Sequence, residues 1–113
     1  MPIAQTAPAT EARVLGVLQA LADEKRLRIL DALRGGERCV CELQADLEMR
    51  QSLLSHHLRA LREAGLVRDR REGRWVHYSL APEALAELVE YVGAVRSDVA
   101  AAATRTDPPG CAP

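Results

Sequence analysis

The sequence lacks any apolar run that approaches the ~20 residues a membrane-spanning helix requires. Residues 1–10 contain neither the basic flank nor the apolar stretch of a secretory signal. We therefore expect a chain that stays in the cytoplasm and has no membrane partner.

Cysteine is scarce, with single residues at positions 39, 41 and 111. An odd number of thiols in a reducing compartment argues against a disulfide scaffold. Only one residue separates Cys39 from Cys41, so we expect the two to be poorly placed to bridge each other. Metal binding or redox sensing is the better interpretation of the pair. The alternative is that both are small buried hydrophobic residues.

Catalytic motifs are also missing from the chain. It contains no Ser/His/Asp order, no glycine loop for a phosphate and no metalloprotease motif. Its 113 residues allow one domain with a modest core, which leaves little room for an active-site pocket. We therefore expect that the protein is not an enzyme.

Net charge is low, −1 at pH 7, but it is unevenly distributed. Residues 50–78 carry seven arginines against three acidic residues, whereas the segments on either side are acidic. A basic segment of this kind is typical of a surface that meets a polyanion.

Apolar residues at helical spacing predict five helices along the chain. The first begins near Thr10, the second follows Asp23 as its cap, and the remaining three are expected at about 41–48, 52–64 and 82–103. Leu27 and Leu33 are assigned to the buried face of the second helix. The inner face of the fourth helix is expected to consist of Leu54, Leu58 and Leu61.

Between the fourth and fifth helices the pattern changes to alternation, which predicts a two-stranded hairpin around Glu72-Gly73. The order α-α-α-α-β-β-α, with a short helix, a turn, a helix and a charged hairpin, is that of a winged helix-turn-helix. The expected fold class is mainly α with a small β-hairpin (α+β). The domain is assigned to residues 10–103, between a flexible arm at 1–9 and a flexible tail at 104–113 that carries Cys111.

The fourth helix has the two faces that a DNA-reading helix needs, because one side must pack on the domain while the other offers hydrogen-bonding groups to base edges. Its outer face carries Gln51, Ser52, Ser55, His56, Arg59 and Arg62. The first turns of this helix are placed for bases, and Arg59 and Arg62 are placed for phosphates. Three hairpin arginines are expected to reach the DNA backbone or the minor groove: Arg70, Arg71 and Arg74.

Taken alone, the polar face of the fourth helix or the charged hairpin would be interpreted as ordinary solvent-exposed surface. Together with the basic segment, they indicate binding to double-stranded operator DNA. His57 is a separate case, because it lies nearer the packed side of the helix and is expected to be structural.

Three stretches carry a resemblance to a known family: residues 39–43 (CVCEL), 54–67 (LSHHLRALREAGLV) and 72–80 (EGRWVHYSL). They resemble the ArsR/SmtB family of bacterial winged-helix metalloregulators, with the hairpin closest to the arsenic-responsive branch. The similarity covers roughly residues 10–95 in order. It implies a homodimer, paired through the first and last helices, that represses transcription and leaves its operator when an inducer binds.

The family's sensor site precedes the recognition helix and uses a Cys-Val-Cys pair, which here falls on Cys39 and Cys41. Thiolates prefer soft ions, so we expect As(III) or Sb(III) as the inducer, with Cd(II), Pb(II) or Cu(I) as alternatives and no permanent cofactor. Residues i and i+2 do not share a helix face. One ion held by both thiols is therefore expected to distort the first turn of the third helix.

The arsenic-sensing branch often has a third cysteine three residues beyond the second, where this chain has Gln44. Cys111 is a candidate third ligand, from the same chain or from the partner, and the alternative is a tail thiol that binds nothing. The family's Zn(II) site on the last helix needs histidines, which residues 82–103 lack, so we expect no such site. Two other functions remain open: a repressor that oxidation of the same thiols releases, and a metal-sequestering protein.

Overall fold

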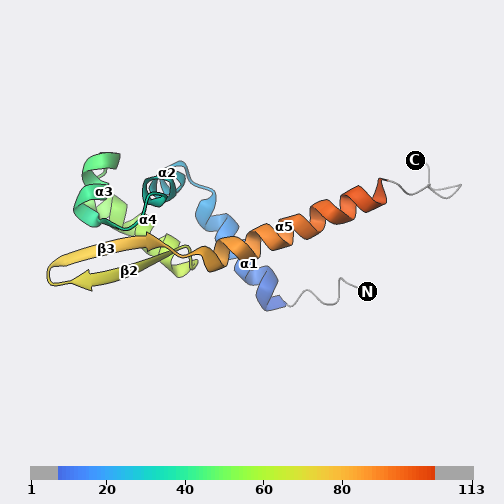
Figure 1. Cartoon of the computed structure of the whole chain (residues 1–113). Coiled ribbons are helices and arrows are strands. Elements are labelled where there is room, and N and C mark those ends of the chain that lie inside the picture. Colours follow the sequence, from blue (N-terminus) through green and yellow to red (C-terminus); the bar gives the residue numbers. More distant parts are fainter. Residues whose placement is uncertain (1–7, 104–113) are drawn as a thin grey trace, which may run out of the picture.

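The structure, a computed structural model, describes residues 8–103. The elements in chain order are α1 (Pro8–Leu21), α2 (Glu24–Leu33), β1 (Arg38–Cys39), α3 (Val40–Leu47), α4 (Gln51–Glu63), β2 (Val67–Glu72), β3 (Trp75–Leu80) and α5 (Pro82–Ala102). Figure 1 shows the hairpin β2–β3 at one end of the molecule and α5 extending from the other. The predicted winged helix-turn-helix is confirmed. The expectations for residues 1–7 and for Cys111 lie outside the described residues.

Local sequence explains where the first two helices begin. α1 begins at Pro8, earlier than the predicted Thr10, with proline at a helix start where its missing amide hydrogen is not needed. Asp23 caps α2 as predicted, because its side-chain carboxylate accepts hydrogen bonds from the backbone amides of Lys25 and Arg26 at 2.8 and 3.2 Å. Leu33 is buried as expected, but Leu27 is 48% exposed, so its assignment to the core was wrong.

The core lies between α2, α3 and α4. Leu54, Leu58 and Leu61 are 0–1% exposed, which confirms the predicted inner face of α4. They pack in one cluster with buried side chains from other elements, among them Ile29, Leu33, Leu43 and Leu66. This apolar contact holds the polar face of α4 outward.

The sheet has three strands in the order β1-β3-β2, one more than the predicted hairpin. β2 pairs with β3 from Val67–Leu80 at the base to Glu72–Trp75 at the tip, and Gly73, at φ +60°, lies in the turn. The added strand is β1, whose Arg38 and Cys39 pair with Tyr78 and His77 of β3. A strand of two residues has no periodicity, and its partner lies far along the chain. This is why alternation did not reveal it.

α1 crosses α5 on the side away from the hairpin (Figure 1). No residue of α5 is buried, although much of one side is apolar. The exposed apolar side chains of the two helices are Leu15, Leu18, Val89, Tyr91, Val92, Val95 and Val99. Within residues 8–103, no helix is both long and apolar enough to cross a membrane.

Candidate DNA interface and thiol site

The two neighbouring cysteines lie at the junction of β1 and α3. Cys39 has an extended backbone (φ −79°, ψ 159°) and is the N-cap of α3, whereas Cys41 is already inside the first turn. The chain switches from strand to helix between them, and their sulfur atoms are in bonding contact, as in a disulfide, with Cα atoms 5.4 Å apart. The expectation that the pair is poorly placed to bridge was therefore wrong. It assumed a regular backbone through both residues.

This junction also changes the expected effect of a bound ion. The predicted distortion of α3 assumed that both cysteines lie within the helix, on different faces. Because Cys39 is the cap and not a helical residue, both sulfurs already meet without unwinding α3. The geometry therefore removes the reason for that distortion.

Cys39 takes part in a reciprocal cap at the start of α3. Its Sγ accepts a hydrogen bond from the backbone amide of Glu42 at 3.4 Å, and Oε1 of Glu42 accepts one from the amide of Cys39 at 2.9 Å. Arg38 lies beside them but is paired with Asp46, and its Nε is 3.9 Å from Glu42. The charge of Arg38 is therefore already engaged by carboxylates.

The two sulfurs differ in access. Cys39 is 7% exposed, whereas Cys41 is on the surface. Within residues 8–103 there is no group of three or more His, Cys, Asp or Glu side chains suited to a metal ion. The third-ligand position of the arsenic-sensing branch is occupied by Gln44. Any third sulfur would have to come from Cys111 or from outside the chain.

All six predicted DNA-facing residues of α4 are exposed: Gln51, Ser52, Ser55, His56, Arg59 and Arg62. Helical spacing divides them into two stripes, one nearer the β2–β3 hairpin with Gln51, Ser55 and Arg62, and a neighbouring one with Ser52, His56 and Arg59. Arg62 forms an ion pair with Asp69 of β2 at 3.3 Å. Arg59 has no ion-pair partner among residues 8–103.

His57 is 5% exposed and faces inward, as predicted. Its Nδ1 accepts a hydrogen bond from Nε of Arg26 on α2 at 3.0 Å, which requires the neutral ring. Burial lowers the pKa of His57, and the charge of Arg26 acts in the same direction, while Asp23 opposes both. His57 therefore ties α4 to α2.

The hairpin arginines divide between its two faces. Arg71 lies on the face toward α4, with Asp69, and Arg74 is in the turn beside it. Arg70 alternates to the opposite face, where it pairs with Glu37 at 2.7 Å. The pKa of the Glu37 carboxyl is lowered, first by that hydrogen bond. Arg70 is thus the one predicted hairpin contact whose charge is already engaged.

A groove of about 380 Å³ runs between α3, α4 and the hairpin. We call the β2–β3 hairpin the wing, and this cavity the α4–wing groove. The polar and charged side chains that line it are Cys41, Gln44, Gln51, Ser55, Arg62, Asp69, Arg71 and Arg74. Its apolar wall is supplied by Val40, Leu58, Trp75, Val76 and Tyr78. Five of the predicted DNA-contacting residues therefore share one cavity with the exposed Cys41: Gln51, Ser55, Arg62, Arg71 and Arg74.

Comparison with known proteins identifies the family. The sequence pattern of bacterial regulatory proteins of the arsR family matches residues 23–69. A candidate arsenical resistance operon repressor ArsR of Halobacterium salinarum is 45% identical over 91 residues, which cover 79% of this chain and 70% of that protein. The chain belongs to the ArsR family.

Other ArsR-family relatives agree with this assignment. The arsenic resistance transcriptional regulator ArsR1 of Pseudomonas putida is 53% identical over 68 residues, or 59% of this chain. The match spans 53% of that regulator, about half of its length. A homodimeric winged helix-turn-helix DNA-binding domain from Mycobacterium bovis has a TM-score of 0.66 and 38% identity, covering 83% of this chain and 86% of that one.

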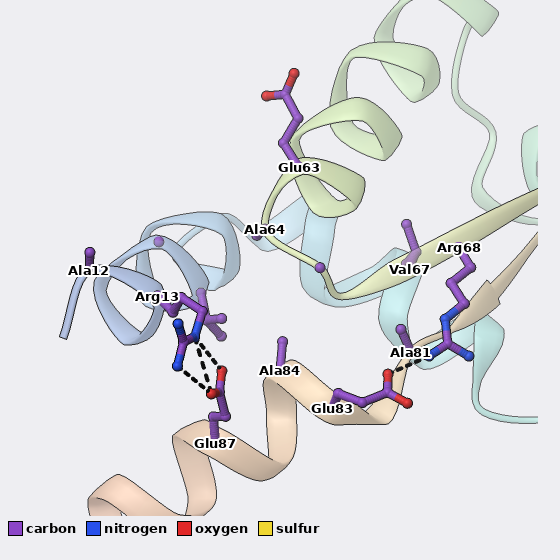
Figure 2. Close-up of a pocket in the computed structure, with 13 residues that line it drawn as sticks. Ala12, Arg13, Glu63, Ala64, Val67, Arg68, Ala81, Glu83, Ala84 and Glu87 are labelled. Atoms are coloured by element: carbon purple, nitrogen blue, oxygen red, sulfur yellow. Dashed lines mark hydrogen bonds and ion pairs between the residues drawn. The ribbon is translucent and has the colours of Figure 1, made fainter. Parts of the chain in front are cut away.

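A second cavity of this ArsR-family chain, about 650 Å³, lies away from the cysteines (Figure 2). It is bounded by α1, the corner between α4 and β2, and the start of α5. Arg13 pairs with Glu87 across it at 2.9 Å, and Arg68 pairs with Glu83 at 2.6 Å. Four of its five charged lining residues are therefore paired with one another, Glu63 being the fifth. The cavity is larger than the α4–wing groove but lacks the excess of arginine found there.

Sequence reasoning missed three features of the site. β1 was not found, Trp75 was assigned to the hairpin but not to the DNA interface although it is 56% exposed beside the arginines, and the pairing of Arg70 with Glu37 was not anticipated. A signal existed only for Trp75, because it stands at the hairpin tip among arginines. The other two depend on contacts between residues far apart in the chain.

Proposed function

We propose that this protein is a transcriptional repressor that binds operator DNA as a homodimer. It leaves the DNA when a thiophilic ion, As(III) or Sb(III) in the first place, binds Cys39 and Cys41. The observation that carries the proposal is the position of the thiol pair. Its sulfurs meet at the start of α3, between the sheet that bears the wing and the helix that precedes α4.

The DNA side of the proposal rests on the exposed face of α4 and on the arginines beside it. A helix of this width fits the major groove, where Gln51, Ser52, Ser55 and His56 would meet base edges. Arg59, Arg62, Arg71 and Arg74 would contact phosphates, which set affinity and its salt dependence more than sequence choice.

The homodimer would form through α1 and α5. Support comes from their exposed apolar side chains, which a single chain leaves in water. The Mycobacterium bovis relative is itself described as homodimeric. A two-fold arrangement would bring two α4 helices to successive major grooves, about 34–36 Å apart.

The inducer is proposed from the chemistry of the donors. Two thiolates favour thiophilic ions over hard ones such as Mg(II), and the Pseudomonas putida relative is named for arsenic resistance. Cd(II), Pb(II) and Cu(I) share this preference and remain alternatives. Cys111 would supply the third sulfur of a three-coordinate ion, from either chain.

Thiol oxidation is a second candidate input, favoured by one observation. Cys39 and Cys41 are already close enough for a disulfide, so an oxidant could join them with little rearrangement. A metal-sequestering protein is the third alternative. It has no need for the arginines of the α4–wing groove.

The test uses fully reduced protein under anaerobic conditions, bound to a duplex of the DNA upstream of its own gene. Arsenite, antimonite, Cd(II), Zn(II) and peroxide are titrated separately while fluorescence anisotropy follows the bound fraction. We expect arsenite and antimonite to release the wild-type protein from the duplex. For Cys39→Ser, the affinity for the duplex should be the same with and without arsenite. Reduced protein that does not bind the duplex would contradict repression and favour sequestration. Release by peroxide alone would identify oxidation as the input.

A further inference from the structure

We propose that Cys41 is part of the DNA-binding surface itself, so that a ligand on its sulfur and the DNA backbone compete for the α4–wing groove. This inference rests on the proposed function and specifies how induction works. Release would then follow from occupancy of the groove, without any unwinding of α3.

The first support is the lining of the groove. Cys41 from α3 lines it together with Gln51 and Ser55 from α4 and Arg71 from β2. A recognition helix in the major groove with a hairpin beside it must straddle a sugar-phosphate strand, because the phosphates separate one DNA groove from the next. That strand would pass between α4 and the wing, which is where the α4–wing groove lies.

The second support is charge. Arg62, Arg71 and Arg74 line the groove against a single acid, Asp69, so an anion fits it. Arg62 and Asp69 are 3.3 Å apart in the free protein, and a phosphate would take over that arginine. Cys41 lies among the side chains that would surround this phosphate.

The third support is the difference between the two sulfurs. Cys41 is exposed and lines the groove, whereas Cys39 is 7% exposed and does not line it. Cys39 instead accepts the cap hydrogen bond from Glu42. The two sulfurs would therefore have different roles. Cys39 would bind a ligand from its buried side, and Cys41 would hold that ligand in the groove that the DNA backbone requires.

Direct competition and a distortion of α3 predict different results when only one of the two thiols is modified. A group attached to Cys41 alone should weaken DNA binding, because no bridge between two thiols is needed to fill the groove. The loss should grow with the size of the group. It should grow further when the group is negative, since it would then occupy the arginines that phosphate needs.

The experiment uses single-thiol proteins, each compared with itself before and after alkylation. One retains only Cys41 (Cys39→Ser, Cys111→Ser), and serine preserves an oxygen acceptor at the cap of α3. Two more are made in a background without cysteine: Gln44→Cys, a second position in the groove, and Ala45→Cys, an exposed position on α3 outside it. Each is treated with iodoacetamide, N-ethylmaleimide or iodoacetate, and its affinity for the upstream duplex is measured.

We expect N-ethylmaleimide on Cys41 or on Gln44→Cys to lower DNA affinity about tenfold or more, and the Ala45→Cys adduct to leave it unchanged. Bound duplex should slow alkylation of Cys41 about tenfold and leave that of Ala45→Cys unaffected. Equal affinity before and after every Cys41 adduct, with no protection by DNA, would overturn the inference. If arsenite still releases the reduced wild-type protein in that case, the proposed function stands and only direct competition fails.

Discussion

Cys39 stands opposite His77 in the β1–β3 ladder, while its sulfur caps α3. One residue thus belongs to the sheet that carries the wing and to the helix that leads into α4. Under the proposed function, a ligand held by this residue would therefore adjoin both the sheet and α3. A coupling of about 1–3 kcal/mol between the two sites corresponds to a 5–150-fold change in operator affinity.

The cap role of Cys39 can be separated from its ligand role with two substitutions. Cys39→Ser keeps a side-chain acceptor for the amide of Glu42, whereas Cys39→Ala removes it. We expect both to abolish the response to arsenite, and Cys39→Ala to be less stable than Cys39→Ser by about 1 kcal/mol. Urea unfolding of reduced protein at a fixed concentration measures the difference. Equal stability would show that the sulfur does not act as a cap.

Arg59 is expected to set part of the salt dependence of DNA binding. It is exposed and has no ion-pair partner within residues 8–103, so its charge is available to a phosphate. Arg59→Ala should flatten the slope of log affinity against log salt by about 0.9 for each protomer, or about 1.8 for the dimer on its operator. Arg70→Ala is the comparison, and it should change the slope less because Arg70 is held by Glu37. Identical slopes for wild type and Arg59→Ala would remove Arg59 from the phosphate contacts.

His57 should make the fold less stable in mild acid. Burial lowers the pKa of His57 in the folded chain, so below about pH 6.5 the unfolded chain takes up a proton that the folded chain resists. Stability from this residue is therefore complete above that pH and is lost as the pH falls through the folded pKa. Protonation would also remove the acceptor for Arg26.

Urea unfolding at about pH 8 and about pH 5.5, at one protein concentration, measures this dependence. His57→Gln should reduce the difference between the two pH values, whereas His56→Gln, a change at its exposed neighbour, should preserve it. A pH dependence that survives in His57→Gln would assign the effect to other groups.

Val92 tests the dimer. It is 53% exposed on the apolar side of α5, and Val92→Asp would place a charge in an interface that has to exclude water. We expect sedimentation velocity to show a monomer, with a loss of operator affinity because only one recognition helix can bind. Glu90→Lys alters charge on the opposite side of the same helix and should remain a dimer. A Val92→Asp variant that is still dimeric would locate the interface elsewhere.

Much of the site followed from patterns within short segments. Leu54, Leu58 and Leu61 recur at helical spacing, so their burial and the outward direction of Ser55 and Arg59 could be predicted together. The hairpin was predictable for the same reason, since Val76, Tyr78 and Leu80 alternate along β3. His57 could be assigned to the packed side, but its partner Arg26 could not be named.

The amino-acid sequence by itself determined which side of each long element is apolar, where α2 is capped and where basic residues gather. Only the tertiary structure decided that Arg38 and Cys39 form a strand, that Arg70 pairs with Glu37 and that Cys41 shares a groove with Arg71 and Arg74. The physical reason is range. Periodicity and capping depend on neighbours within a few residues, whereas strand pairing, charge pairing and grooves depend on which distant segments the buried core brings together.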